Sequence, residues 1–262
     1  MLWRVLAVVA ALGLGACAEQ PAPRAAPSPA GAYEPVSGQP GKDVIWVPTS
    51  QALVDKMLAM AKVTEKDFVM DLGSGDGRLV ITAAQRGARA LGVEYNPDMV
   101  ALSKKNAERA GVTARASFVK QDLFETDLSQ ATVITLFLLP SLNLKLRPKL
   151  LALKPGTRIV SNSFTMDTWL PDDTESVRDT PGCDSFCTAH LWIVPAKVAG
   201  TYRTPHGEVV LTQRFQELSG SFVPPRGQAL ALSGKVVGEQ IFFAAGGRAY
   251  AGRLNGGKLE LK

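Results

Sequence analysis

The sequence predicts an α/β protein that has a doubly wound, parallel sheet followed by a small antiparallel β domain. Three observations lead to this prediction. A glycine-rich turn follows an apolar strand candidate at residues 68–70, and strand and helix patterns then alternate as far as residue 195. Over residues 196–262 the pattern changes to short alternating runs between glycine turns, which is typical of an antiparallel β meander. The chain of 262 residues is long enough for both parts.

The first strand leads into the sequence DLGSGDG at residues 71–77, and a helix is expected over residues 78–84, ending at Gly87. Glycine is needed where the backbone takes a positive φ angle or where a ligand lies against bare main chain. The helix that follows directs its free N–H groups toward whatever is bound, so this turn predicts a nucleotide-cofactor loop. Gly77 follows Gly75 by two positions, whereas the dinucleotide fingerprint needs three, and this disfavours an NAD-dependent oxidoreductase.

The later elements of the α/β domain follow in alternating order. A helix is expected to begin at Asn96, with Pro97 at its first position, and to end at Gly111. Residues 132–139 are apolar on both faces, as expected of a central parallel strand. Further strands are expected at residues 90–93, 116–119 and 189–194. Glu94 ends the second strand about 20 residues past the glycine turn, where a carboxylate can accept both ribose hydroxyls of a nucleoside.

The pattern D-x-G-x-G-x-G at residues 71–77 resembles the first motif of the seven-strand, Rossmann-like S-adenosylmethionine-dependent methyltransferases. This resemblance implies S-adenosylmethionine as the cofactor, with Glu94 on its ribose, Asp122 at the adenine amino group and Leu123 packed on the adenine ring. The cofactor-binding residues that it implies are Asp71, Gly73, Ser74, Gly75, Gly77, Glu94, Tyr95, Asp122 and Leu123. The competing interpretation is that Asp71 caps the turn and Glu94 is a solvated acid at a strand end.

Three further segments narrow the resemblance. They are IWVPTS at residues 45–50 before an amphipathic helix, the segment LFLLPSLNLKLRPKLLALKPGTRIVS at residues 136–161, and WLP at residues 169–171. Together they are similar to bacterial relatives of the mitochondrial protein-lysine methyltransferases, over roughly residues 44–195. The resemblance implies transfer of a methyl group to an amine, such as a protein lysine or a small amine.

The catalytic residues are less well indicated. Methyl transfer needs aligned, dry reactants, and positioning alone can supply about 7–11 kcal/mol. A lysine must first lose its proton, either by desolvation or to an acceptor group. Residues 138–143 take the place of the Asn/Asp-Pro-Pro-aromatic motif of many N-methyltransferases, and the absence of that motif argues against adenine, cytosine or glutamine amide as acceptor. Pro140 and Asn143 are the candidate catalytic residues of this segment, although an ordinary strand-to-helix turn would explain them equally well.

The N-terminal segment predicts a membrane-anchored protein. Residues 1–17 resemble a bacterial lipoprotein signal cleaved before Cys17, because Arg4 precedes an apolar run too short to cross a bilayer, which takes roughly 20 residues. Residues 18–43, rich in proline and alanine, read as a tether before the methyltransferase domain at residues 44–195. We therefore expect a lipoprotein of the bacterial cell envelope that faces the periplasm, at the outer membrane, with a cytoplasmic location as the alternative.

This location conflicts with a cofactor that is made in the cytosol, so a second hypothesis is a non-catalytic envelope binding protein that retains the methyltransferase fold. Residues 196–262 carry nine basic and four acidic side chains, against 17 of each in residues 44–195. This basic β domain could contact anionic lipid or cell-wall polymer, or be an ordinary solvated surface. No motif for reading RNA or DNA is present, so we expect no nucleic-acid partner. The sequence does not indicate an oligomeric state.

The cysteines leave three interpretations open. Cys183 and Cys187 could form a disulfide, as expected in an oxidising compartment, or remain free thiols. With His190 they could also contribute to a metal site, but that would need a fourth ligand and better spacing, so we predict no metal.

Overall fold

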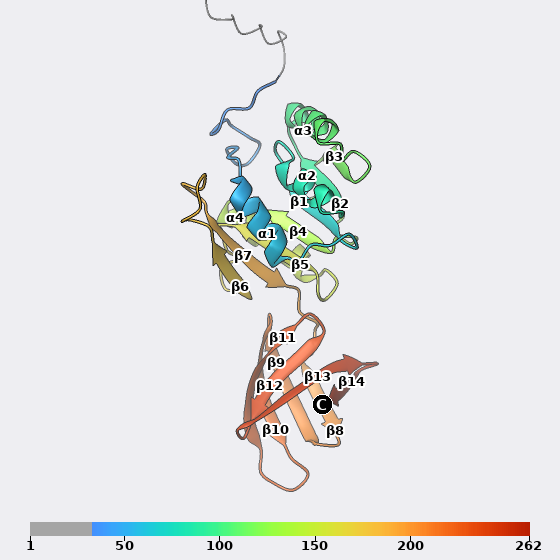
Figure 1. The fold of residues 1–262 in the computed structure, drawn as a ribbon. Coiled ribbons are helices and arrows are strands. Elements are labelled where there is room, and N and C mark those ends of the chain that lie inside the picture. Colours follow the sequence, from blue (N-terminus) through green and yellow to red (C-terminus); the bar gives the residue numbers. More distant parts are fainter. Residues whose placement is uncertain (1–32) are drawn as a thin grey trace, which may run out of the picture. The chain divides into compact units, whose positions relative to one another are not determined.

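The computed structural model describes residues 33–262 (Figure 1). The chain divides into two compact units, residues 1–34 and residues 35–262, and the fold described below is that of the second. The predicted signal segment, Cys17 and most of the predicted tether lie outside the described residues. Among the helices that the structure describes, none is long and apolar enough to cross a membrane.

The first sheet has seven strands in the order β3-β2-β1-β4-β5-β7-β6. Its strands are β1 (Phe68–Leu72), β2 (Arg89–Glu94), β3 (Ala116–Lys120), β4 (Val133–Leu136), β5 (Arg158–Asn162), β6 (Asp173–Ser176) and β7 (Thr188–Ile193). The pairs among β1 to β5 are parallel, whereas β7 runs antiparallel to both β5 and β6. The strand order reverses between β1 and β4, and ligands bind at such a switch point. The predicted doubly wound, seven-strand sheet is therefore confirmed.

Four helices accompany this sheet, and local signals explain where they begin. They are α1 (Gln51–Met60), α2 (Arg78–Gln85), α3 (Pro97–Arg109) and α4 (Pro140–Leu151). Ser50 caps α1 by accepting the N–H of Leu53, and Asn96 caps α3 by accepting the N–H of Asp98. Proline at the first position of α3 and α4 has the φ angle that a helix needs.

The strand predicted for residues 132–139 is shorter in the structure, because β4 ends at Leu136 and Pro140 already begins α4. Hydrophobicity alone could not show this boundary, since residues 137–139 are as apolar as the strand. They leave the sheet at its switch point, and all three line the cleft described below.

Both faces of the sheet are covered by apolar side chains. Residues of α1, α2 and α3 pack on one face, and α4 packs on the other together with Trp169 and Trp192. The two tryptophans are fully buried, with ring centroids 6.1 Å apart, and the indole N–H of Trp192 donates to the carbonyl of Trp169 at 2.8 Å. Trp192 pairs with Ile159 near the start of β5, so this packing lies toward the amino ends of the central strands.

Asp67 ties three strands together at the amino ends of β1, β4 and β5, the end of the sheet away from the switch-point cleft. Its buried carboxylate accepts the backbone N–H of Thr64 at 2.8 Å and the hydroxyl of Thr132 at 2.8 Å, and it forms an ion pair with Arg158 at the start of β5. Burial alone would raise the pKa of Asp67, but these hydrogen bonds and the guanidinium outweigh it and hold the pKa below its usual value. The charged form therefore stabilises the fold.

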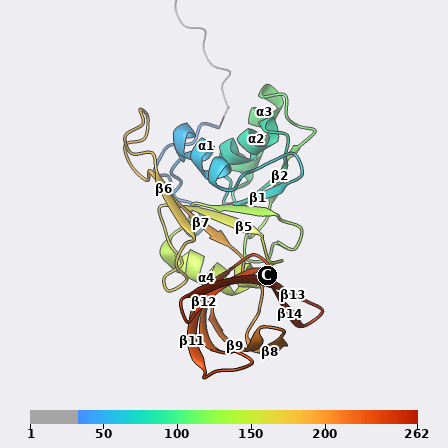
Figure 2. The same cartoon turned by 60° about the horizontal axis from the view of Figure 1, so that its bottom comes forward.

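The second sheet also has seven strands, which follow one another in sequence as an antiparallel meander (Figure 1, Figure 2). Its strands are β8 (Gly200–Thr204), β9 (Gly207–Arg214), β10 (Glu217–Val223), β11 (Leu230–Val237), β12 (Gln240–Ala245), β13 (Arg248–Asn255) and β14 (Lys258–Leu261). The sheet encloses its own apolar core, and β14 comes close to β8, so it curves toward a barrel. The predicted antiparallel β domain is confirmed, with glycine turns such as Gly246-Gly247 between its strands.

Candidate active site

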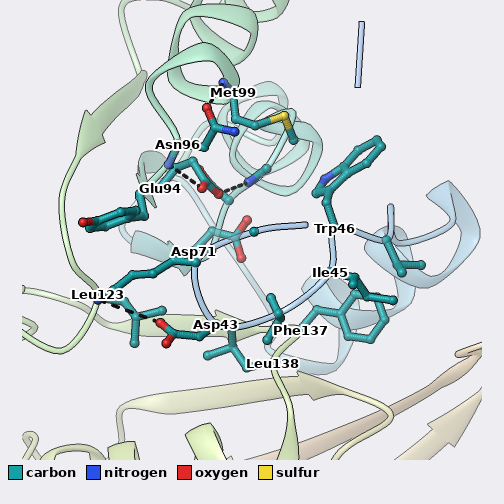
Figure 3. Close-up of a pocket in the computed structure, with 18 of the residues that line it drawn as sticks. Asp43, Ile45, Trp46, Asp71, Glu94, Asn96, Met99, Leu123, Phe137 and Leu138 are labelled. Atoms are coloured by element: carbon teal, nitrogen blue, oxygen red, sulfur yellow. Dashed lines mark hydrogen bonds and ion pairs between the residues drawn. The ribbon is translucent and has the colours of Figure 1, made fainter. Parts of the chain in front are cut away.

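A cleft lies at the carboxyl ends of β1, β2 and β4, where the strand order reverses. Figure 3 shows Asp71 between two groups of side chains, with Glu94 and Asn96 on one side and Phe137 and Leu138 on the other. Apart from Lys42 and Asp43, which precede α1, the charged lining residues come from the β1, β2 and β3 half of the sheet, and apolar residues follow β4. The cleft therefore has a polar half and an apolar half.

The glycine loop needs its glycines for two separate reasons. Gly73, Gly75 and Gly77 all have positive φ angles, between 54° and 84°, which side chains disfavour. In addition, a Cβ atom on Gly75 would lie 2.5 Å from the indole nitrogen of Trp46, so the backbone there is in direct contact with its neighbour. The loop is tied to β2 because the N–H groups of Gly73 and Ser74 both donate to the carbonyl of Val93. This is a cradle in which a ligand can lie against bare main chain.

Glu94 connects the glycine loop to the start of α3. One carboxylate oxygen accepts the N–H of Gly75 at 3.0 Å, and the other accepts the N–H of Asn96 at 2.9 Å. Each oxygen keeps a further lone pair, so the carboxylate can still accept two hydroxyl groups. Tyr95 follows it and is half exposed at the cleft. The side chain of Glu94 is thus fixed in place and also has acceptors left for the ribose of a nucleoside.

Asp71 is the buried acid of the cleft, with 5% of its surface exposed. The hydroxyl of Thr135 donates to it at 2.7 Å across the β1 and β4 pair. Burial, and to a lesser extent the negative charges of Glu94 and Asp76, raise the pKa of Asp71 to about 7. A cationic ligand in the cleft would stabilise its carboxylate form.

Asp122 lies just after β3 and pairs with a lysine that sequence reasoning did not single out. The ammonium of Lys42 lies 2.5 Å from a carboxylate oxygen of Asp122, and this hydrogen bond is the main reason why the pKa of Asp122 is lowered. The same ammonium lies 4.7 Å from the centre of the Tyr95 ring. Leu123, the next residue after Asp122, also lines the cleft (Figure 3).

Lys42 belongs to a segment, residues 39–49, that we name the strap. All of its residues line the cleft. It turns back on itself, since Pro40 pairs with Ile45 and the N–H of Trp46 donates to the carbonyl of Gln39. The end of the segment that reads as a tether in the sequence is therefore a wall of the site. No local pattern signals this, because the partner Asp122 lies 80 residues further along the chain.

Pro140 and Asn143 do not line the cleft. Pro140 begins α4, and Asn143 is fully buried on the same helix. The amide of Asn143 donates to the carbonyl of Phe164 at 3.1 Å and to the hydroxyl of Ser161 at 3.3 Å, so it holds the loop after β5 against α4. These positions are those of a strand-to-helix turn, the alternative that the sequence left open. Phe164 itself does line the cleft, and sequence reasoning missed it.

Cys183 and Cys187 form a disulfide in the loop before β7, which decides among the three interpretations of this pair. Phe186, next to Cys187, also lines the cleft. Within residues 33–262, no cluster of His, Cys, Asp and Glu side chains could hold a metal ion.

Comparison with known proteins matches this cleft to a methyltransferase family. The model of the ANTKMT methyltransferase domain matches residues 71–173. A protein-lysine N-methyltransferase of Saccharolobus islandicus (strain REY15A) is 48% identical over 139 residues, which are 52% of this chain and 86% of that enzyme. The chain belongs to this methyltransferase family. It is a methyltransferase whose cofactor is S-adenosylmethionine, and the bare glycine cradle and the free acceptors of Glu94 fit that cofactor.

Two further proteins are similar to this methyltransferase. The adenine nucleotide translocase lysine N-methyltransferase of Mus musculus is 39% identical over 130 residues, and the match spans 49% of this chain and 56% of the mouse enzyme. A solved structure described as an RNA methyltransferase from Salinibacter ruber in complex with S-adenosyl-L-homocysteine is 47% identical, with a TM-score of 0.54, and covers 58% of this chain and 96% of its own. The family model does not include the strap, Phe186 or strands β8 to β14 of this methyltransferase.

Proposed function

We propose that this protein transfers the methyl group of S-adenosylmethionine to the side-chain amine of a protein lysine. The observation that carries the proposal is the division of the cleft, in which a polar, nucleoside-binding half adjoins an apolar half without a charged side chain. The 48% identity to a protein-lysine N-methyltransferase supports the same acceptor.

The polar half would hold the cofactor. The glycine loop offers bare main chain, Glu94 offers two hydroxyl acceptors, and Asp122 with Leu123 offers an acid and an apolar surface for the adenine. When bound, S-adenosylmethionine supplies a methyl group that the amine lone pair attacks, forming the N–C bond while the C–S bond breaks with its electrons going to sulfur, and the surplus proton of the amine leaves to water. The task of the chain is to align the two partners and exclude water.

The apolar half would prepare the acceptor. Among the described residues that line the cleft, those that follow β4 and β5 or precede β7 are Phe137, Leu138, Leu139, Leu142, Phe164 and Phe186, and none is charged. An amine that enters these surroundings loses hydration, which lowers its pKa and favours the neutral, nucleophilic form. Desolvation can therefore replace a dedicated base.

Two experiments test the proposal: the first measures cofactor binding, and the second identifies the acceptor. Calorimetric titration of S-adenosylmethionine into the full chain should give micromolar binding that falls at least tenfold in Glu94→Ala. Glu108→Ala, an exposed acid on α3, is the matched control and should bind normally. Incubation of the host's envelope proteins with radioactive cofactor, followed by acid hydrolysis, should then yield labelled methyl-lysine. A folded chain that does not bind the cofactor would contradict methyl transfer and favour a non-catalytic scaffold, and label on another residue or on RNA would contradict the lysine acceptor.

For the location, we propose a lipid-anchored protein that faces the bacterial periplasm. The sequence before Cys17 supports this, and so does the Cys183–Cys187 disulfide, because disulfides persist in oxidising compartments. Mass spectrometry of the mature N-terminus should find a diacylated Cys17, whereas an intact Met1 would contradict the anchor.

A further inference from the structure

Three phenylalanines from distant parts of the chain meet in the apolar half of the cleft. Phe137 directly follows β4, Phe164 comes two residues after β5, and Phe186 comes two residues before β7. The three strands are neighbours in the sheet, in the order β4-β5-β7. Because β7 runs antiparallel to β5, its beginning lies at the same edge as the ends of β4 and β5. The topology therefore brings one aromatic ring from each strand to one place.

The rings form one continuous surface, which we name the aromatic wall. The centroid of Phe186 lies 5.3 Å from that of Phe137 and 6.0 Å from that of Phe164, and the last two rings are 6.3 Å apart. The planes of Phe137 and Phe164 are nearly parallel, at 23°, and Phe186 is tilted against both. At these distances the rings touch, so a ligand would lie over the wall and not between the rings.

Phe186 is held in place at a cost to the fold. Its side chain is 40% exposed, although other large aromatic side chains such as Trp169 and Trp192 are fully buried. Its backbone has a φ angle of 55°, which is rare for a bulky residue. The Cys183–Cys187 disulfide closes the loop that carries it. A strained, exposed aromatic residue that a covalent bond holds at the edge of a cleft indicates a functional constraint.

The chemistry of the wall favours a cation on an apolar stem. The face of an aromatic ring carries negative charge density and attracts ammonium groups, and this attraction grows when water is excluded. A lysine side chain would lay its methylene groups on the rings and place its nitrogen at their face. Each methyl group added to that nitrogen increases the apolar contact, and a trimethylated nitrogen stays charged at every pH.

A nucleobase is the other ligand that stacks on aromatic rings, and the structure favours it less. Among the described residues, the cleft lining from β4, β5 and β7 contains no polar side chain that could recognise the edge of a base. Residues 44–195 carry 17 basic and 17 acidic side chains, so this domain has no net positive charge for a phosphate backbone.

We propose that Phe137, Phe164 and Phe186 form the acceptor subsite, in which the methylene groups of a lysine lie on the rings, and which prefers the methylated forms because their weakly hydrated, charged nitrogen can contact the ring faces. This proposal rests on the lysine acceptor proposed above. It implies that a methylated product remains a good ligand, so the enzyme adds further methyl groups to the same nitrogen.

The direct test uses the full chain saturated with S-adenosylhomocysteine. Nα-acetyl-Nε-trimethyllysine amide is titrated and followed by NMR, in parallel with its uncharged isostere, in which carbon replaces the quaternary nitrogen. We expect the charged ligand to bind about tenfold more tightly, because cation–π contacts that exclude water reach that size. Equal affinity of the two ligands, or no binding of either, would overturn the proposal.

Variants show whether the aromatic wall is responsible. Phe186→Leu keeps an apolar side chain without a ring face and should lower the affinity for trimethyllysine about tenfold, whereas Phe186→Tyr should restore it. Phe242→Leu is the matched control, because Phe242 has the same 40% exposure but lies on β12, away from this cleft. In product analysis, Phe186→Leu should shift the distribution from trimethyl-lysine toward monomethyl-lysine.

Two further outcomes separate this proposal from the one on which it rests. If the wild-type chain binds S-adenosylhomocysteine and methylates lysine, but Phe186→Leu changes neither ligand affinity nor product distribution, only the acceptor subsite is refuted. If the chain does not bind S-adenosylhomocysteine at all, the proposed function fails first. Tighter binding of adenosine 5′-monophosphate than of trimethyllysine to the saturated chain, lost in Phe186→Leu, would make the wall a nucleobase subsite and overturn the lysine assignment.

Discussion

Replacing Asp71 with asparagine should stabilise the methyltransferase domain at pH 8 while it weakens cofactor binding. Asp71 is buried, and its pKa of about 7 lies far above the 3.8 of an unperturbed aspartate. The folded protein therefore binds a proton at Asp71 more tightly than the unfolded chain does. As the pH rises from 3.8 to about 7, Asp71 lowers the free energy of unfolding. Above pH 7 the full cost is present, and below pH 3.8 it is absent.

The size of the effect follows from the same values. At about 1.4 kcal/mol for each pKa unit, the difference between 3.8 and about 7 gives an upper bound of about 4 kcal/mol at pH 8. The asparagine keeps the hydrogen bond from Thr135 but buries an amide N–H group without an established partner, which costs about 1 kcal/mol or more. We expect a net gain of about 3 kcal/mol, or roughly 6–12 °C in melting temperature.

Urea unfolding followed by tryptophan fluorescence measures this gain. In a Trp3→Phe background, every tryptophan of the chain lies between residues 46 and 192, so the signal reports on the methyltransferase domain and, through the contact of Trp169 with Phe215, on its junction with the β domain. Asp127→Asn is the control, because that exposed carboxylate accepts hydrogen bonds from Ser129 and its pKa is lowered. It should show no gain. An Asp71→Asn variant that is less stable than the wild type at pH 8, or whose gain is equal at pH 4.5 and pH 8, would refute the reasoning.

The remaining predictions concern Asp67, which supports the sheet, and the glycine loop and the strap, which border the cofactor site. Asp67→Asn should destabilise the fold by about 3 kcal/mol at pH 7, because it removes the carboxylate that pairs with the guanidinium of Arg158. This difference should shrink below pH 3.8, because the carboxylate with the lowered pKa becomes protonated in the folded protein as well. Gly75→Ala and Gly111→Ala should each cost about 1 kcal/mol of stability, because both glycines have positive φ angles. Only Gly75→Ala should lower the affinity for S-adenosylmethionine, by at least tenfold in calorimetry, because the added Cβ meets a neighbouring side chain at Gly75 and none at Gly111. Lys42→Met removes the ion pair that holds the strap to Asp122. Stopped-flow measurement should therefore show S-adenosylhomocysteine dissociating up to about fivefold faster. An unchanged dissociation rate would exclude the strap as a barrier to release.

Much of the fold could be predicted from local patterns. The spacing of Gly73, Gly75 and Gly77 requires a turn with positive φ angles, and the structure has such a turn at the end of β1. Glu94 lies at the end of β2 and reaches the glycine loop, as the strand and helix alternation predicts for a parallel sheet. These features depend on residues within about one βαβ unit, where hydrophobic periodicity and turn chemistry act directly.

The boundary at residue 136 shows where local patterns stop being sufficient. Residues 137–139 are as apolar as β4, and only the start of α4 at Pro140 removes them from the sheet. Asn143 likewise resembles a catalytic amide in the sequence, but its hydrogen bonds hold the loop of Phe164.

Contacts across the sheet could not be predicted in this way, because they depend on which distant segments the strand order makes neighbours. Lys42 meets Asp122 across 80 residues, and Phe186 joins the aromatic wall only because β7 turns back beside β5. The pKa of Asp71 is also a property of the folded chain, since it follows from burial and not from residue type. The glycine spacing was therefore enough to indicate the cofactor, whereas the surface that receives the acceptor arises from long-range packing.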